Sequence, residues 1–223
     1  MTVLDLSQPL GPATALWPGS EPFSAPVVED YGEYGFWARQ LGFPEHSGTH
    51  LDAPAHRIRG GATTEAVEAD RLVRPAVRID ARGWCGADRG WTLDAAHVEE
   101  WEAAHGRVPA GCWVLLCTGW DRFLGDFGLY LGDPPDFPGY GASAAELLVE
   151  RGVAGIGIDT LGVDQGASEE SPVHTIALGG GLWHLEGLVG LDAVPATGAT
   201  LFVGAVKLVG GSGAPARVLA LVD

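Results

Sequence analysis

The sequence is poor in basic residues and has no long apolar run. Among its 223 residues, 13 Lys and Arg stand against 29 Asp and Glu, which gives a formal charge of −16. This charge repels phosphate backbones and anionic lipid, so binding to nucleic acid or to a membrane surface is not expected. Because no run of 18 apolar residues occurs, a membrane-spanning segment is not expected either.

Cysteine is also scarce. Cys85, Cys112 and Cys117 form neither an even set nor a CxxC pair. A disulfide framework and a thiolate zinc site are therefore not expected. The first residues lack the basic and then apolar pattern of a secretory signal. We therefore expect a protein of the reducing cytoplasm.

Glycine and proline are plentiful, at 34 and 15 residues, but they are spread along the chain and form no linker. One domain over residues 1–223 is expected. Short apolar runs with β-branched residues between these breakers predict strands. The runs cover residues 3–7, 36–43, 75–80, 112–120, 153–159, 200–209 and 217–223.

Helices are predicted over 92–106, over 143–152 and from Pro172 onward. Thr92 or Asp94 is the expected N-cap of the first helix, and Ser143 and Glu146 have the spacing of a capping box in the second. The strands cluster at both ends of the chain and do not alternate regularly with helices. We therefore predict an α/β fold with a mixed, strand-rich β core and flanking helices.

Residues 44–56, PEHSGTHLDAPAH, hold three of the seven histidines. His46 and His50 have the i, i+4 spacing of a metal-binding pair on a helix, but Ser, Gly and Pro make a helix unfavourable here. A turn followed by extended chain is predicted, which puts His50 and Asp52 on one face. His56 joins that face if Pro54 does not bend the chain.

Imidazole and carboxylate groups together suit zinc, manganese or iron. Asp52 is the natural bridging ligand because a carboxylate can bind two ions and an imidazole cannot. Glu186 lies in the apolar stretch WHLEGLVGL, where an unpaired carboxylate would be costly, so a metal or a salt bridge is its expected partner. His184 shares a strand face with Glu186 and is expected either behind the metal ligands or at the substrate.

PEHSGTHLDAPAH resembles the HxGTHxDxPxH signature of the metal-dependent cyclase and hydrolase family, which includes bacterial kynurenine formamidase and isatin hydrolase. Residues 17–23, 114–120 and 157–164 are similar to further family segments, so the resemblance covers nearly the whole chain. It implies a swivelling β/β/α fold and a homodimer or homotetramer.

The resemblance also implies the roles of individual residues. Residue by residue, it gives a first ion to His46, His50, Asp52 and Glu186, and a second ion to Asp52, His174 and Glu186. It implies one or two divalent ions per chain, with Zn²⁺ preferred and Mn²⁺ as the alternative. His56 matches the general acid/base of the family.

The activity implied is hydrolysis of a formamide, cyclic amide or lactone of a small-molecule substrate, with hydroxide formed on the ion. The single preferred reaction is N-formyl-L-kynurenine to L-kynurenine and formate. Two alternatives stay open. One is a metal-dependent cyclase that closes a ring in aromatic polyketide or other secondary metabolism, and the other is a metal-binding module without catalysis.

Overall fold

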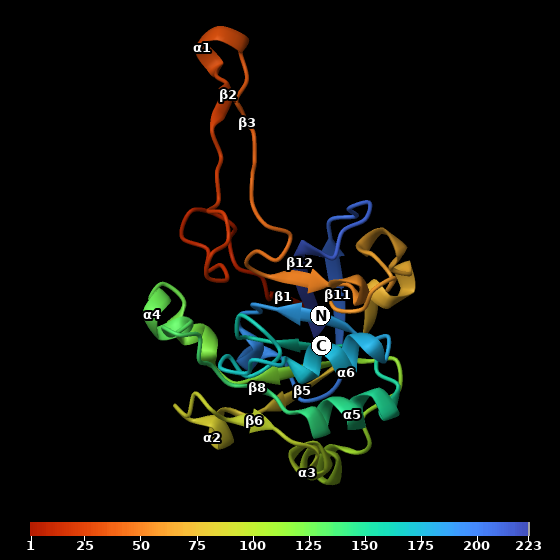
Figure 1. Ribbon diagram of the computed structural model, residues 1–223. Coiled ribbons are helices and arrows are strands. Elements are labelled where there is room, and N and C mark those ends of the chain that lie inside the picture. Colours follow the sequence, from red (N-terminus) through yellow and green to blue (C-terminus); the bar gives the residue numbers. More distant parts are fainter. Residues whose placement is uncertain (223) are drawn as a thin grey trace.

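Parallel and antiparallel strands combine in one eight-stranded sheet in the computed structural model, which describes residues 1–222 (Figure 1). The strands of this sheet are β1 (Thr2–Asp5), β4 (His50–Asp52), β5 (Val73–Asp80), β7 (Trp113–Cys117), β9 (Gly155–Ile158), β10 (Trp183–Glu186), β11 (Ala199–Ala205) and β12 (Gly213–Val222). Their order is β1-β12-β11-β5-β7-β9-β10-β4, and β4 also pairs with β12. The sheet therefore closes on itself like a barrel.

The pairs β5–β7, β7–β9 and β9–β10 are parallel, and the remaining pairs of the large sheet are antiparallel. Two small two-stranded sheets lie outside it, formed by β2 (Val27–Glu29) with β3 (Ala38–Arg39) and by β6 (Thr92–Leu93) with β8 (Gly139–Tyr140). The predicted α/β fold with a mixed, strand-rich core is confirmed. Asp223, the last residue of the strand predicted over 217–223, lies outside the described residues.

The helices are α1 (Tyr31–Tyr34), α2 (Arg82–Cys85), α3 (Ala95–His105), α4 (Phe127–Tyr130), α5 (Ala142–Arg151) and α6 (Pro172–Gly179). Of these, α3, α5 and α6 pack on the outer face of the sheet, whereas α1 lies far from it (Figure 1). None of the helices within residues 1–222 is both long enough and apolar enough to cross a membrane. The three helices predicted from the sequence are α3, α5 and α6.

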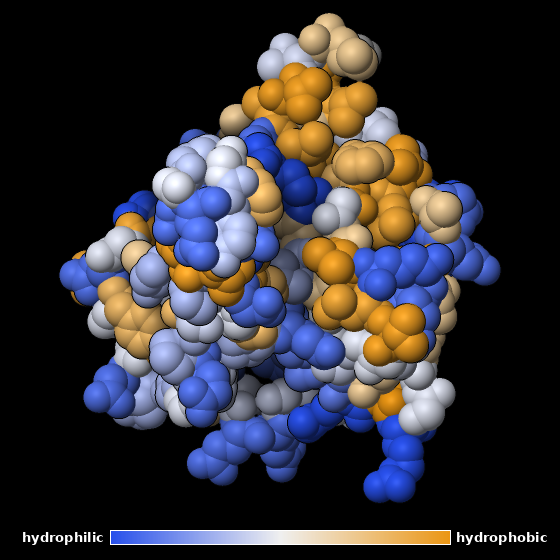
Figure 2. All heavy atoms as spheres, turned by 90° about the horizontal axis from the view of Figure 1, so that it is seen from above, coloured by the Kyte–Doolittle hydropathy of each residue, from blue (hydrophilic) through white to orange (hydrophobic). Residues whose placement is uncertain are grey.

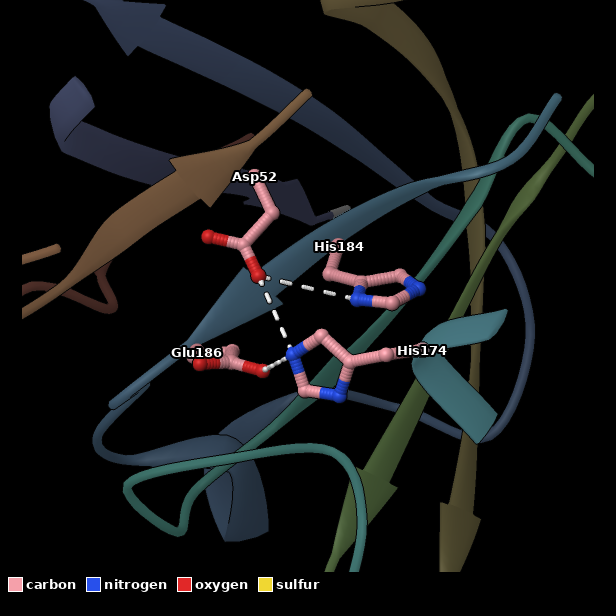
Figure 3. Close-up of side chains that lie close together, drawn as sticks. All are labelled: Asp52, His174, His184 and Glu186. Carbon is pink, nitrogen blue, oxygen red and sulfur yellow. Dashed lines mark ion pairs between the residues drawn. The ribbon is translucent and has the colours of Figure 1, made fainter. Parts of the chain in front are cut away.

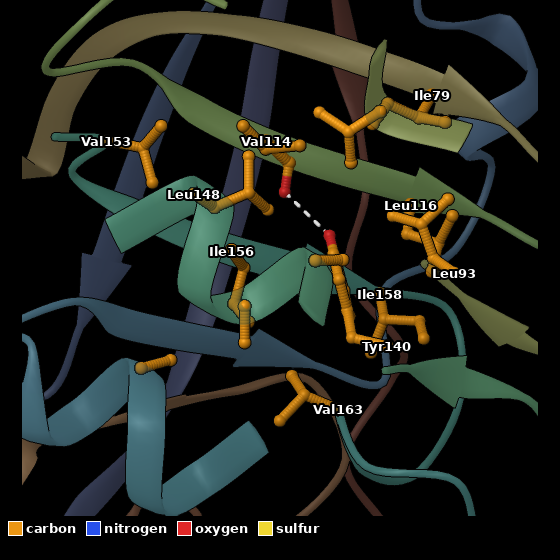
Figure 4. Packing of buried hydrophobic residues seen from close by; sticks show 14 of the residues in the cluster. Ile79, Leu93, Val114, Leu116, Tyr140, Leu148, Val153, Ile156, Ile158 and Val163 are labelled. Carbon is orange, nitrogen blue, oxygen red and sulfur yellow. Dashed lines mark hydrogen bonds between the residues drawn. The ribbon is translucent and has the colours of Figure 1, made fainter. Parts of the chain in front are cut away.

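Two apolar clusters fill the two faces of the sheet. Val114, Leu116 and Ile156 pack under α3, α5 and α6, and the Tyr140 hydroxyl donates a hydrogen bond to the Val114 carbonyl within this cluster (Figure 4). The alternate residues, such as Leu115, belong to the cluster on the inner face. Because both faces are buried, the parallel strands read as continuous apolar runs, which is why the sequence revealed them.

Details of the helix ends differ from the prediction. Asp94 is the N-cap of α3, as one of the two predicted candidates. The capping box predicted from Ser143 is wrong, because α5 begins one residue earlier with Gly141 at its N-cap. The Ser143 hydroxyl instead accepts a hydrogen bond from the Ala95 backbone N–H of α3, so it joins two helices.

Residues 24–42 form an arm that projects away from the body, with α1 at its tip (Figure 1). The strand predicted over 36–43 is reduced here to β3. Phe23 and Phe43 stack at the base, with ring centroids 5.9 Å apart. The hydrophobic side chains along the arm are half-exposed or more, namely Val27, Val28, Tyr31, Tyr34, Phe36, Trp37 and Leu41.

Candidate metal centre

Strands β4 and β10 place the predicted site on the outer face of the sheet, beneath α6. They pair antiparallel, with His184 opposite Asp52 and Glu186 opposite His50. Leu51 and Leu185 point to the inner cluster, so their neighbours point to the opposite face. Helix α6 brings His174 over this face (Figure 3). Four residues far apart in sequence thus meet because of one strand pairing and one helix.

The chain enters β4 through the turn that the sequence predicts. Gly48 has a φ of +60°, which only glycine adopts without strain. This turn directs His46 back toward Asp52, with His46 Nδ1 2.7 Å from Asp52 Oδ1. After β4, Pro54 starts a 3₁₀ turn that ends at His56. Pro54 does bend the chain, yet the His56 ring centroid lies 4.0 Å from that of His46.

The two carboxylates each face imidazoles on both sides. Oδ1 of Asp52 lies 2.7 Å from His46 and 3.3 Å from His50, while its Oδ2 lies 3.6 Å from both His174 and His184. Oε2 of Glu186 lies 3.3 Å from His50, and Oε1 lies 3.4 Å from His174. The structure therefore brings together all five predicted metal residues around the two carboxylates.

Hydrogen bonds fix the tautomer of three imidazoles. His50 Nδ1–H donates to the Gly48 carbonyl at 3.0 Å, and His174 Nδ1–H donates to Asp164 at 2.6 Å. His46 Nε2–H donates to the Ser212 hydroxyl at 3.0 Å. In each ring the second nitrogen points to the carboxylates. Partners of this kind orient metal-binding histidines and raise their basicity.

Nitrogen and carboxylate lone pairs face one another across these short distances, so positive charge is required between them. His50 Nε2 and Asp52 Oδ2 are buried and have no hydrogen-bond partner. Protons or a divalent cation can supply the charge, and buried groups of this kind persist only when they are so paired. The residues present therefore fit a divalent metal ion, with borderline nitrogen and oxygen ligands.

The pKa values report the same demand for positive charge. Burial alone would lower the pKa of His50, but Asp52 and Glu186 raise it well above its ordinary value. Burial alone would also lower the pKa of His174. Asp164 and Asp52 outweigh this effect and raise the pKa of His174 to about 10. Although burial would raise the pKa of Asp52, the surrounding histidines outweigh burial and hold it well below the usual range.

His56 differs from the other site histidines. It is exposed at the rim, and its ring makes no hydrogen bond to the residues that the structure describes. Desolvation by the surrounding protein lowers the pKa of His56, which favours the neutral ring. It lines a cavity of about 400 Å³ with Trp17, Arg57 and Leu161, and with His50 and Glu186 at the floor. His56 is thus placed to meet a molecule in this cavity.

Sequence reasoning missed three partners of the predicted ligands. Asp164 ends the segment 157–164, and the family resemblance of that segment assigns it no role. Ser212 belongs to the GGSG stretch, which reads as a turn, and Glu45 accepts its hydroxyl hydrogen bond at 2.8 Å. The contact between Glu45 and Ser212 depends on the β4–β12 pairing, so nothing local in the sequence reveals it. His184 was expected near the site, and it lies beside Asp52.

Comparisons with known proteins agree with this geometry. The family model described as a putative cyclase matches residues 4–165. Isatin hydrolase of Roseibium aggregatum is 36% identical over 189 residues, covering 80% of this chain and 72% of its own length. Kynurenine formamidase of Salinibacter ruber is 30% identical over 228 residues and covers 98% of this chain and 97% of its own.

A solved structure extends the similarity to the fold. Isatin hydrolase A from Ralstonia solanacearum superposes with a TM-score of 0.93 at 36% identity, over 100% of this chain and 92% of the other. The likeness thus includes every described element of the sheet. Together these matches show that the chain belongs to the putative cyclase family, in which it is a metal-dependent amide hydrolase.

Proposed function

We propose that the protein hydrolyses the ring amide of a small, isatin-like aromatic substrate. The observation that carries this proposal is the cavity of about 400 Å³ whose floor holds His50 and Glu186 and whose rim holds His56. Water adds to the amide carbonyl carbon, the C–N bond breaks, the nitrogen gains a proton and a carboxylate remains.

The bound ion and His56 have separate roles in this proposed reaction. His46, His50, Asp52, His174 and Glu186 would hold one or two divalent ions, Zn²⁺ by preference and Mn²⁺ as the alternative. When bound, such an ion polarises a carbonyl and lowers the pKa of water from 15.7 to about 7. His56 removes a proton from water and delivers one to the leaving nitrogen, because its ring is otherwise unpaired and faces the cavity.

The cavity lining supports a cyclic amide over N-formyl-L-kynurenine. N-formyl-L-kynurenine carries an ammonium group, whose charge a free carboxylate in the lining would neutralise. Among the described residues that line the cavity, the one carboxylate is Glu186, and it already faces His50 and His174. The Salinibacter ruber match still favours the formamide as a second candidate, since it spans almost the whole of both chains.

The test measures metal content and hydrolysis on one purified sample. Elemental analysis gives the ions per chain, and absorbance follows ring opening of isatin. Formate release from N-formyl-L-kynurenine is measured in parallel. Rapid isatin opening that stops with chelator and returns with metal supports the proposal. Faster formate release would reverse the order of substrates, and activity on neither with metal bound would contradict hydrolysis and favour the ring-closing alternative.

We also propose that the protein works in a reducing compartment such as the cytoplasm. We further propose that it works as a homo-oligomer whose subunits contact one another through the arm. A two-stranded ribbon is marginal alone in water. In the view onto the end from which the arm projects, hydrophobic residues gather toward the top and right of the face, beside hydrophilic ones (Figure 2). Tyr31, Tyr34, Phe36 and Trp37 are 49% to 73% exposed. At 150–250 Å² for a whole aromatic side chain, they leave on the order of 400 Å² uncovered.

That area is about half of the 800 Å² that each partner of a stable interface buries. The aliphatic residues of the arm supply more, and a second copy offers an arm of the same kind. Light scattering on the eluting protein tests this proposal. We expect a dimer or tetramer that dissociates when Phe36 and Trp37 are both changed to Ser. A monomeric wild-type protein, or an unchanged mass in the variant, would contradict it.

A further inference from the structure

His184 is a fully buried histidine without a hydrogen bond. Its ring is 0% exposed, and neither Nδ1 nor Nε2 has a partner among the described residues. An unpaired buried polar atom loses its hydrogen bonds to water without replacement, and native proteins contain few such groups. The ring lies on β10 directly opposite Asp52 of β4. Its position therefore calls for a partner.

His46, His50 and His174 each already donate one ring N–H to a fixed acceptor and turn the other ring nitrogen to the carboxylates. His184 turns Nδ1 to the same place, 3.6 Å from Oδ2 of Asp52. Because no hydrogen bond holds either ring nitrogen, Nδ1 can present its lone pair without breaking an existing contact.

The distances around His184 match those between ligands on one ion. Bonds of 2.0–2.1 Å to a tetrahedral ion separate its ligands by about 3.3–3.4 Å. His174 Nε2 lies 3.4 Å from Glu186 Oε1 and 3.6 Å from Asp52 Oδ2, and His184 Nδ1 lies 3.6 Å from the same Asp52 oxygen. Figure 3 shows these four side chains converging on one point. All four ligand atoms lie within 4.8 Å of one another.

We propose that His184 is the fourth ligand of a divalent ion held by Asp52, His174 and Glu186. This inference rests on the proposed function and adds a ligand to one of its two subsites. Two imidazole nitrogens and two carboxylate oxygens would supply the four ligands that a structural zinc site has. His174 and Glu186 line the cavity together with His46 and His50, whereas His184 and Asp52 do not. His184 and Asp52 would therefore hold the ion from its buried side.

The experiment compares metal stoichiometry and affinity in wild type, His184→Phe and His184→Asn. Phenylalanine keeps the ring volume and removes both nitrogens, while asparagine covers the case in which phenylalanine prevents folding. His105→Ala is the matched control, because His105 is exposed at the end of α3. Each protein is stripped with chelator and titrated with Zn²⁺, then dialysed for elemental analysis. Circular dichroism verifies the fold.

We expect the His184 variants to lose one ion per chain, or to bind it at least 10-fold more weakly, while the control matches wild type. A folded variant with wild-type stoichiometry and affinity would overturn the role of His184. In that case metal binding by wild type would still support the proposed function. If wild type itself binds no ion, both proposals fail, so the two failures are distinct.

Discussion

The absence of a side chain at Gly213 of β12 is expected to leave the space that the His46 ring occupies. A Cβ at this position would lie 2.4 Å from Cε1, 2.7 Å from Nδ1 and 2.9 Å from Nε2 of the His46 ring. Real Cβ atoms do not approach other atoms so closely. Gly213→Ala must therefore displace the His46 ring, although the substituted residue has no chemical role of its own.

The magnitude follows from what His46 loses. Its side chain is 26% exposed, so the ring can swing toward solvent and leave Asp52 and Ser212. Overpacking of this kind costs about 1–3 kcal/mol of unfolding free energy. For a chain of this size, 1 kcal/mol lowers the melting temperature by about 2–4 °C, so a decrease of about 2–12 °C is expected. The affinity for metal should fall by at least 10-fold, since perturbing even a supporting residue costs 10–100-fold.

Thermal denaturation and zinc titration measure the two effects. Gly83→Ala is the control, because a Cβ on Gly83 meets no atom within 4 Å and the backbone is helical. It should bind metal like wild type and melt at the same temperature or slightly higher. If Gly213→Ala binds zinc and turns over substrate as wild type does, His46 is not a required ligand and this reasoning is wrong.

Two further substitutions and one labelling experiment probe other parts of the site and core. His56→Ala should reduce kcat by about 10²–10⁴-fold with metal content retained, and equal loss of metal would contradict its role in proton transfer. Asp164→Asn removes the carboxylate that orients His174, so zinc affinity should fall about 10–100-fold by titration, with little change expected if orientation is unimportant. Burial raises the pKa of the cysteine thiols to about 11 for Cys85 and about 12 for Cys112 and Cys117, so a thiol reagent at pH 8 should label them only after unfolding.

The sequence predicted most of the sheet because its parallel strands are buried on both faces. Runs such as 112–120 and 153–159 are apolar without interruption, and the structure has β7 and β9 there. The arm escaped prediction for the opposite reason. Its residues 36–43 have the composition of a strand, but the arm packs on nothing within the described chain that would extend β3.

The turn and the extended chain of residues 44–56 were predictable because each depends only on residues close in sequence. Gly48 and the alternation of β4 follow from residues within a few positions of each other. The support for the ligands is not local, since Ser212 lies 166 residues from the His46 ring that it orients. Strand pairing alone brings such residues together, and a single sequence does not specify which strands pair.

Asp52 belongs both to the local sequence motif and to the long-range pairing of strands. Strand β4 is three residues long, and Asp52 pairs across it with His184 of β10 on one side and Gly213 of β12 on the other. The same residue therefore closes the sheet through its backbone and gathers the histidines through its side chain. Because the strands that close the sheet also carry the ligands, the full set of metal residues exists only when the sheet is closed. A cation bound there stabilises the closed sheet by its own binding free energy, about 2.7 kcal/mol at 100 times its Kd. A metal ion held by these residues would thus stabilise the fold as well as serve the proposed reaction.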